Sequence, residues 1–354
     1  MILRAILSAT CVMSSCAAVE LPPVIACCPA FRDGQSVINA DQTVIIIWDP
    51  VSKMEHFIRQ ASFKTDTNDF GFLVPTPAQP ELDESGNDAF PYLKKLTEPE
   101  VITKWQSNMG CGGEKYVTTY PKGTTQPEVR ILDEKMVAGF HAVVLEASSA
   151  GALAKWLAEK GFVLSKEIEA WAQPYVDGNW KFTALKVAKE SRDRTGNVAA
   201  GALRLSFRTD RPLFPYREPD YKNAARGQFR TLRIYFIGES RYDGDIVDQA
   251  WTGKSVWSNK LDAFNRKQIL GTLKLPEASV PAQFWLTEFE DNWPDAVATG
   301  DLYFSRDANQ QILKRPPIIH YATIPIVEGT CVLFAIAFIT VVIWRIRKRR
   351  AAQS

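Results

Sequence analysis

The feature that most constrains this chain is an uncharged stretch near its C-terminus that a cluster of cations closes. No charged side chain occurs from residue 329 to residue 344. With the apolar residues just before it, this stretch approaches the roughly 20 residues that a membrane-spanning helix needs. The cations that follow at once are Arg345, Arg347, Lys348, Arg349 and Arg350. Because such clusters remain on the cytoplasmic side, the sequence predicts a transmembrane helix at residues 326–344 and a basic cytoplasmic tail at residues 345–354.

The N-terminus has the pattern of a secretory signal peptide. Arg4 precedes a mostly apolar stretch over residues 5–19, and prolines follow it. One cation, a short apolar segment and small residues near its end are typical of such signals. We expect a signal peptide within residues 1–26, cleaved after Ala18 or after Ala26. An uncleaved anchor is the alternative.

The two ends together predict a single-pass protein whose bulk lies outside the cytoplasm. Residues 27–314 would form an extracytoplasmic domain, and residues 315–325, which begin with Arg-Pro-Pro, a short stalk. The whole chain has 42 Lys+Arg against 40 Asp+Glu, a formal net charge of +2. Since many of the cations lie at the ends, the domain itself is nearly neutral. We therefore expect attachment to a membrane and no binding of nucleic acid.

Alternation of apolar and polar residues predicts strands at both ends of the domain. It is clearest at residues 56–63, 203–208 and 229–237, where it indicates half-buried strands. Further strands are predicted at 37–49, 70–74, 180–185, 284–289 and 302–305. Between these groups the spacing predicts helices. Strands, then helices, then strands favour an α+β fold, here a predominantly antiparallel β ectodomain with two to four helices.

Three positions predict where the helices begin. Thr97 lies three residues before Glu100, the spacing of a capping box, and predicts a helix that carries Trp105. A second helix is predicted to start near Ser149. A third is predicted to start near Ser165 and to end at Pro174, because proline interrupts the hydrogen bonds of a helix.

Several separated segments resemble the bacterial family called domain of unknown function 2330. They are Cys-Cys-Pro-Ala at 27–30, Phe-Gly-Phe-Leu-Val-Pro-Thr-Pro at 70–77, Ala-Leu-Ala-Lys-Trp-Leu at 152–157 with Gly-Phe at 161–162, and Leu-Arg-Leu-Ser-Phe at 203–207 with Pro-Tyr-Arg at 215–217. The resemblance implies an exported, often membrane-anchored bacterial protein without an assigned activity. Together with the orientation that the C-terminal cations predict, we expect a location in the bacterial cell membrane, with the N-terminus outside and the C-terminus in the cytoplasm. It transfers no functional residues.

Three cysteines lie between the two apolar ends: Cys27, Cys28 and Cys111. In an oxidising compartment cysteines tend to pair, so we expect a disulfide from Cys27 or Cys28 to Cys111. The sequence does not decide which of the two pairs. The third cysteine would be free, lipidated at Cys27, or paired with another chain. Cys111 has glycine on both sides, and a nucleophilic role for it is a further alternative.

No motif of metal or cofactor chemistry stands out. The spacing of Asp243, Asp245 and Asp248 is not that of a calcium-binding loop, and we expect a solvated turn there. We expect His56 and His141 to be half-buried structural side chains within strands. The sequence also contains no phosphate-binding loop and no nucleophile motif. We therefore expect no metal and no cofactor.

The loop at residues 211–219 is the candidate ligand site. It places Phe214 and Tyr216 between arginines, Arg217 among them, on a backbone restricted by prolines. Aromatic faces beside cations suit a peptide or a glycan, and Tyr216 and Arg217 are the first residues to test. The alternative is that the rings pack onto the sheet and the prolines only limit the freedom of the loop.

The absence of catalytic motifs favours a non-catalytic binding or envelope-interaction module over an enzyme. Its partner would be an envelope protein, a peptide or a glycan. The alternative is an exported hydrolase that uses carboxylates or Cys111. Two carboxylates facing one another in a cleft, or a histidine beside Cys111, would favour that alternative.

Overall fold

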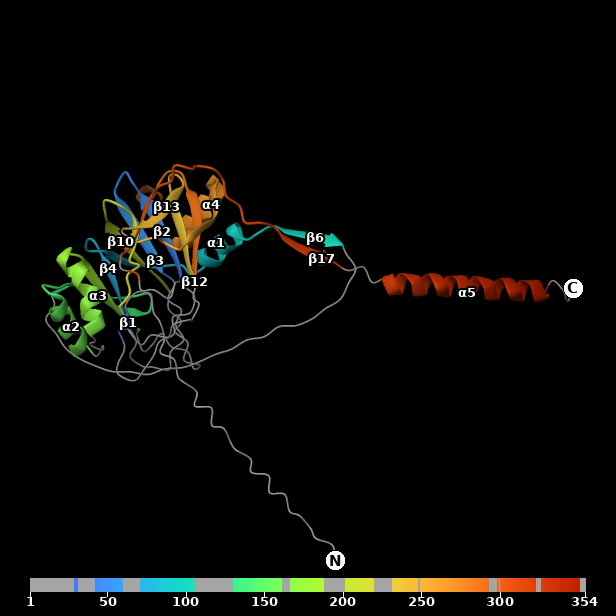
Figure 1. Cartoon of the computed structure of the whole chain (residues 1–354), viewed down its shortest axis with the longest axis horizontal. Helices are drawn as coiled ribbons and strands as arrows, with labels where there is room; N and C mark the ends of the chain where they lie inside the picture. The colour runs from blue at the N-terminus through green and yellow to red at the C-terminus, as the bar shows by residue number, and fades with distance from the viewer. Residues whose placement is uncertain are drawn as a thin grey trace, which may run out of the picture.

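The fold is α+β, and most of its strands pair antiparallel, as predicted (Figure 1). The computed structural model of the chain describes residues 29–30, 42–59, 71–105, 130–160, 166–187, 201–219, 231–247, 249–292, 298, 300–322 and 326–350. The strands, in chain order, are β1 (Pro29–Ala30), β2 (Gln42–Asp49), β3 (Met54–Arg59), β4 (Gly71–Thr76), β5 (Glu81–Ser85), β6 (Val101–Trp105), β7 (Arg130–Val137), β8 (Phe140–Glu146), β9 (Lys181–Val187), β10 (Ala202–Arg208), β11 (Leu213–Phe214), β12 (Thr231–Gly238), β13 (Tyr242–Ile246), β14 (Lys254–Lys260), β15 (Trp285–Asn292), β16 (Leu302–Arg306) and β17 (Ile318–Ala322). The helices are α1 (Ala89–Thr97), α2 (Ala150–Glu159), α3 (Lys166–Asp177), α4 (Ala263–Leu273) and α5 (Ile326–Arg350), with a 3₁₀ turn at Glu277–Ser279.

A seven-stranded sheet in the order β14-β15-β12-β2-β3-β10-β5 forms the centre of the domain. Its neighbours pair antiparallel, except that β12 and β2 run parallel. The β-branched run in β2 is buried on both faces. Val44 and Ile46 enter the main core, whereas Ile45 and Ile47 join a second cluster with α1 and α4. Such continuous apolar runs are typical of strands that are covered on both sides.

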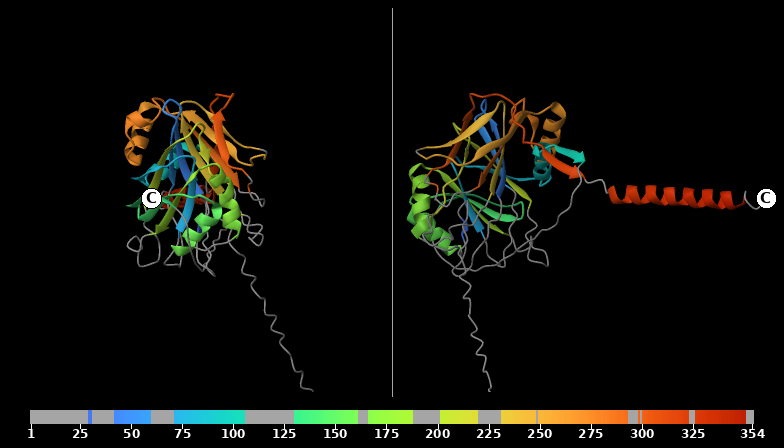
Figure 2. Two further views of the ribbon diagram at one scale, coloured as in Figure 1. Left: turned by 90° about the vertical axis from the view of Figure 1, so that its left-hand side faces the viewer. Right: turned by 45° about the vertical axis from the view of Figure 1, so that its right-hand side comes forward.

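The main core lies between this sheet and two smaller ones. The first has the order β1-β4-β9-β8-β7 and the second the order β11-β16-β13. Phe72 and Phe140 from the five-stranded sheet and Phe304 from the three-stranded sheet share one cluster with the inner face of the large sheet. Helices α2 and α3 cover the outer face of the five-stranded sheet. The two helical layers therefore lie on different sides of the domain (Figure 2).

The predicted helix after Thr97 is wrong. Helix α1 ends at Thr97, and residues 101–105 form β6, which pairs parallel with β17. Glu98 is extended, with φ −61° and ψ 145°, because the residue before a proline disfavours the helical conformation. Pro99 therefore ends one helix here and does not begin another. Strand β17 lies within the segment that was predicted as a stalk.

The helix predicted from Ser149 is confirmed, and the third helix differs in its end. Ser149 caps α2 by accepting a hydrogen bond from the backbone N–H of Ala152 at 3.0 Å. Helix α3 continues through Pro174 to Asp177, so the predicted end is wrong. Tyr175, which is buried, donates a hydrogen bond from Oη to Asp301 at 2.6 Å and holds this last turn against the domain.

Helix α5 extends away from the domain, beyond β6 and β17 (Figure 1). Its described apolar side chains, Phe334 and Phe338 among them, are exposed. Among the residues described in this structure, no helix has the length and apolar content that crossing a membrane requires.

Candidate functional site

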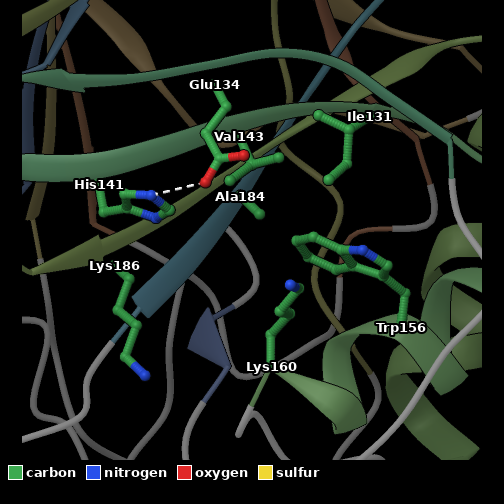
Figure 3. Close-up of a pocket in the computed structure, with 8 residues that line it drawn as sticks. All are labelled: Ile131, Glu134, His141, Val143, Trp156, Lys160, Ala184 and Lys186. Carbon is green, nitrogen blue, oxygen red and sulfur yellow. Dashed lines mark ion pairs between the residues drawn. The ribbon is translucent and has the colours of Figure 1, made fainter.

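A pocket of about 210 Å³ lies between α2 and the outer face of the five-stranded sheet (Figure 3). Strands β7, β8 and β9 provide one wall, and α2 provides the other. The lining residues are Ile131, Glu134, His141, Val143, Trp156, Lys160, Ala184 and Lys186. The pocket therefore combines small and aromatic apolar side chains with three charged groups and one imidazole.

The strand register places these side chains on one face. His141 on β8 lies opposite Lys186 on β9, and Val143 lies opposite Ala184. Because alternate residues of a strand share a face, both pairs point toward α2. Val143 and Ala184 are buried, whereas Lys186 is half-buried and His141 is exposed. The floor of the pocket is thus apolar and its rim is polar.

Helix α2 contributes Trp156 and Lys160. Trp156 is 5% exposed and belongs to the cluster beneath the helix. Lys160 is the C-cap residue of α2, one turn after Trp156, so the two side chains are neighbours on the helix surface. The Lys160 ammonium lies 5.7 Å from the centroid of the Trp156 ring, within the range of a cation–π contact.

The polar rim contains one acid–imidazole pair. His141 Nε2 lies 2.8 Å from Glu134 Oε1, and the two side chains are 46% and 49% exposed. With a neutral imidazole the lining carries two ammonium groups against one carboxylate. The described lining includes no serine, threonine or cysteine and no second carboxylate.

The predicted aromatic loop is placed elsewhere, and two of its rings face inward. Phe214 is fully buried and Tyr216 is 2% exposed. The Arg217 side chain is 31% exposed, and its Nε lies 3.4 Å from Asp301 Oδ2. Ligand binding at these three residues stays a prediction, for which Arg217 provides the partly exposed group.

Two buried carboxylates hold this loop in place. Asp291 accepts hydrogen bonds from Tyr216 Oη at 2.5 Å, Thr252 Oγ1 at 2.7 Å and Trp251 Nε1 at 3.1 Å. Asp301 accepts from Tyr175 Oη and from the backbone N–H groups of Tyr216 and Arg217. Burial raises the pKa of the Asp301 carboxyl. Neither carboxylate lines the pocket, and both serve the packing of the loop.

A third carboxylate, Glu55, lies inside the main core. It is fully buried, and its Oε2 accepts a hydrogen bond from the backbone N–H of Leu213 at 2.9 Å. Its Oε1 has no hydrogen-bond partner among the described residues. Burial raises the pKa of this carboxyl well above its usual range, because an ionised carboxylate is poorly solvated there.

The two histidines predicted to be structural differ from one another. His56 is buried, with Nδ1 2.8 Å from Ser206 Oγ and Nε2 2.8 Å from the carbonyl oxygen of Ser279. Burial lowers its pKa. His141 was expected to be half-buried, but it is exposed at the pocket. Strand alternation places it on the face that α2 covers, and that position was the available signal.

Two further predictions concern residues outside the pocket. Asp243 and Asp245 were expected in a solvated turn; both are exposed, but they lie in strand β13, which pairs with β16. Asp248 lies outside the described residues. Asp245 forms an ion pair with Arg211. Within the described residues, no group of three His, Cys, Asp or Glu side chains is placed to hold a metal ion. Cys27, Cys28 and Cys111 lie outside the described residues.

Comparison with known proteins identifies a family for this chain. A family model described as an uncharacterized protein conserved in bacteria, DUF2330, matches residues 22–305. The matched range includes every residue that lines the pocket and ends before β17 and α5. No curated protein and no solved structure matches significantly.

Proposed function

We propose that this chain, which belongs to DUF2330, a family of uncharacterized proteins conserved in bacteria, is a membrane-anchored extracytoplasmic module that binds a small ligand. The observation that carries the binding function is the pocket at Trp156. It offers an apolar floor and a few polar groups at the rim, the composition that small-molecule sites share.

The anchor is supported by α5 and by the sequence on either side of it. The helix has 25 residues and is therefore about 38 Å long at the usual rise per residue, more than the ~30 Å of a bilayer core, although its described part alone falls short of a membrane span. The uncharged stretch from residue 329 to residue 344 lies within it. A helix with apolar side chains exposed to water is unfavourable, and a lipid bilayer would cover them.

The Glu134–His141 pair is the observation that favours the alternative, an exported hydrolase. A carboxylate that accepts a hydrogen bond from an imidazole orients it and stabilises its charged form, and such an imidazole can act as a general base toward water. The pair is nearly half exposed, however, and no nucleophile or second carboxylate lines the described pocket. Binding without turnover is therefore the better supported of the two functions.

A screen for binding and turnover in one sample separates these functions. The full chain in lipid nanodiscs is mixed with a library of small organic acids, amines, alcohols, esters and sugars, and ligand-observed NMR follows both binding and composition. We expect compounds that compete for one site and remain unchanged over many hours. Product signals that disappear in Glu134→Gln would support the hydrolase. A library without any competing ligand would contradict the binding function.

The anchor is tested by two fusions in a bacterial host. Green fluorescent protein placed after residue 354 is expected to fluoresce, because that end would lie in the cytoplasm. Alkaline phosphatase placed after residue 322, in a chain without α5, is expected to be active, because it would be exported. The control replaces Arg347, Lys348, Arg349 and Arg350 by glutamine. Because these cations set the orientation of the helix, we expect a smaller fraction of the chains to have the C-terminus in the cytoplasm. A dark fluorescent fusion with an inactive phosphatase would contradict the proposed topology.

A further inference from the structure

We infer that the pocket at Trp156 takes a small organic anion that has an apolar, preferably aromatic, body and one carboxylate. This inference rests on the proposed binding function and names its ligand class. Two properties of the pocket carry it: the apolar floor limits the size and kind of the body, and the distribution of charge at the rim selects its sign.

The floor accepts only a small apolar body. Val143, Trp156 and Ala184 are 6%, 5% and 3% exposed, so their contacts with the domain leave little surface for the ligand. The volume of about 210 Å³ is below the roughly 300–1,000 Å³ of sites for drug-sized molecules. A single substituted ring or a short branched chain fits this size. Placing such a body on the accessible part of this floor is favourable because it removes apolar surface from water.

The rim favours a negative group over a positive one. In Figure 3 the Lys160 side chain reaches toward the Trp156 ring, and Lys186 lies on β9, which pairs with β8. The one carboxylate of the lining, Glu134, already contacts the imidazole of His141 at 2.8 Å. A ligand carboxylate can therefore accept hydrogen bonds from Lys160 while its body lies on the floor. An amine in the same position would be repelled by the Lys160 ammonium. It would have no free carboxylate to pair with, because Glu134 already contacts His141.

Two variants that each remove one charge are expected to change the affinity for an aryl carboxylate in opposite directions. Lys160→Gln removes the cation and is expected to weaken binding of an aryl carboxylate about tenfold, the range of one charge-assisted hydrogen bond. Glu134→Gln removes a like charge near the ligand and is expected to strengthen that binding about two- to threefold. Glutamine still offers an oxygen to His141. Both side chains are exposed, so neither change disturbs the core.

Lys155→Gln is the matched control. Lys155 is exposed, lies on α2 as well, and does not line the pocket. Its replacement changes the net charge of the protein and of the helix exactly as Lys160→Gln does. We expect the affinity for the aryl carboxylate to change less than twofold, because long-range effects between exposed charges are screened by salt.

The probes are 4-methylbenzoate, 4-methylbenzylamine, 4-methylbenzyl alcohol and N-acetylglucosamine, titrated into the full chain in phosphatidylcholine nanodiscs. Saturation-transfer NMR gives their dissociation constants, and empty nanodiscs correct for partitioning into lipid. We expect 4-methylbenzoate to bind most tightly, with the two opposite changes given above.

Tighter binding of the amine, the alcohol or the sugar would overturn the anion class while leaving the proposed binding function in place. So would a loss of benzoate affinity in Lys155→Gln equal to that in Lys160→Gln, or a weakening in Glu134→Gln. If none of these probes binds and the wider library also contains no competing ligand, the binding function itself fails. The two failures are thus distinguishable.

Discussion

Replacing Asp291 by alanine is expected to remove about 3 kcal/mol from the free energy of unfolding. Asp291 is 1% exposed, and three side-chain donors from Tyr216, Trp251 and Thr252 converge on its carboxylate. Without the carboxylate the buried Tyr216 hydroxyl and the half-buried Trp251 indole N–H lose their acceptor, whereas Thr252 is exposed and can turn to water. Each unsatisfied buried donor costs roughly 1–3 kcal/mol, and the removed cost of burying the charge offsets part of that sum.

Chemical unfolding of the full chain in detergent micelles, followed by tryptophan fluorescence, measures this loss. Asp291→Asn keeps one carbonyl oxygen for a donor and is expected to lose less than alanine does. Asp243→Ala is the control, because Asp243 is exposed on β13 and exposed positions usually change stability by less than about 0.5 kcal/mol. Equal stability of the Asp291→Ala and Asp243→Ala proteins would contradict a structural role for this carboxylate.

The second large effect is the dependence of stability on pH that Glu55 contributes. Burial raises the pKa of the folded Glu55 carboxyl well above its usual range, whereas the unfolded side chain titrates near pH 4.3. Between these two values the folded protein holds a proton that the unfolded chain has released. Stability therefore falls as pH rises, by up to about 1.4 kcal/mol per pH unit. The stability that the protonated Glu55 carboxyl contributes is fully present below the pKa of the unfolded chain, and it is lost as pH rises through the pKa of the folded protein.

Glu55→Gln is expected to remove this slope. Glutamine is neutral at every pH and still accepts a hydrogen bond from the backbone of Leu213. We expect the unfolding free energy of the variant, relative to that of the wild type, to increase from pH 5.5 to pH 6.5 and again to pH 7.5. His56 has a lowered pKa and acts in the opposite direction, but it is present in both proteins and cancels in the comparison. Glu81→Gln, at an exposed position of β5, is the control. Parallel curves for wild type and Glu55→Gln would contradict a protonated buried carboxyl.

The strands with clear alternation and the helices α2 and α3 were predictable because their signals are local, whereas α1, α4 and strands such as β7 and β14 were not predicted. Alternation identified β3, β10 and β12, and the β-branched run identified β2. The helix placed after Thr97 was wrong for a local reason as well. The spacing of Thr97 and Glu100 favours the start of a helix, whereas Pro99 favours an extended conformation at the residue before it. Glu98 is extended, so the effect of the proline is the stronger of the two.

The pocket was not predictable, because residues that are distant in sequence form it. His141 and Lys186 meet only through the pairing of β8 with β9, and α2 must then cover that face. The same limit applies to the aromatic loop. Composition marked Phe214 and Tyr216 as aromatic residues between cations, but their direction depends on acceptors far along the chain. Asp291 and Asp301 are 75 and 85 residues away from Tyr216, and no local pattern indicates either contact.

The parallel pairing of β2 with β12 has a consequence for how the chain matures. During synthesis β2 can form its hairpin with β3 early, but its other edge has no partner until the chain has grown to Thr231. Pairings between distant segments slow folding, and an uncovered edge of apolar residues is prone to join other chains. A nascent chain that stops before β12 exposes this edge. The protein therefore depends on completion of its C-terminal half to protect its N-terminal strands from aggregation.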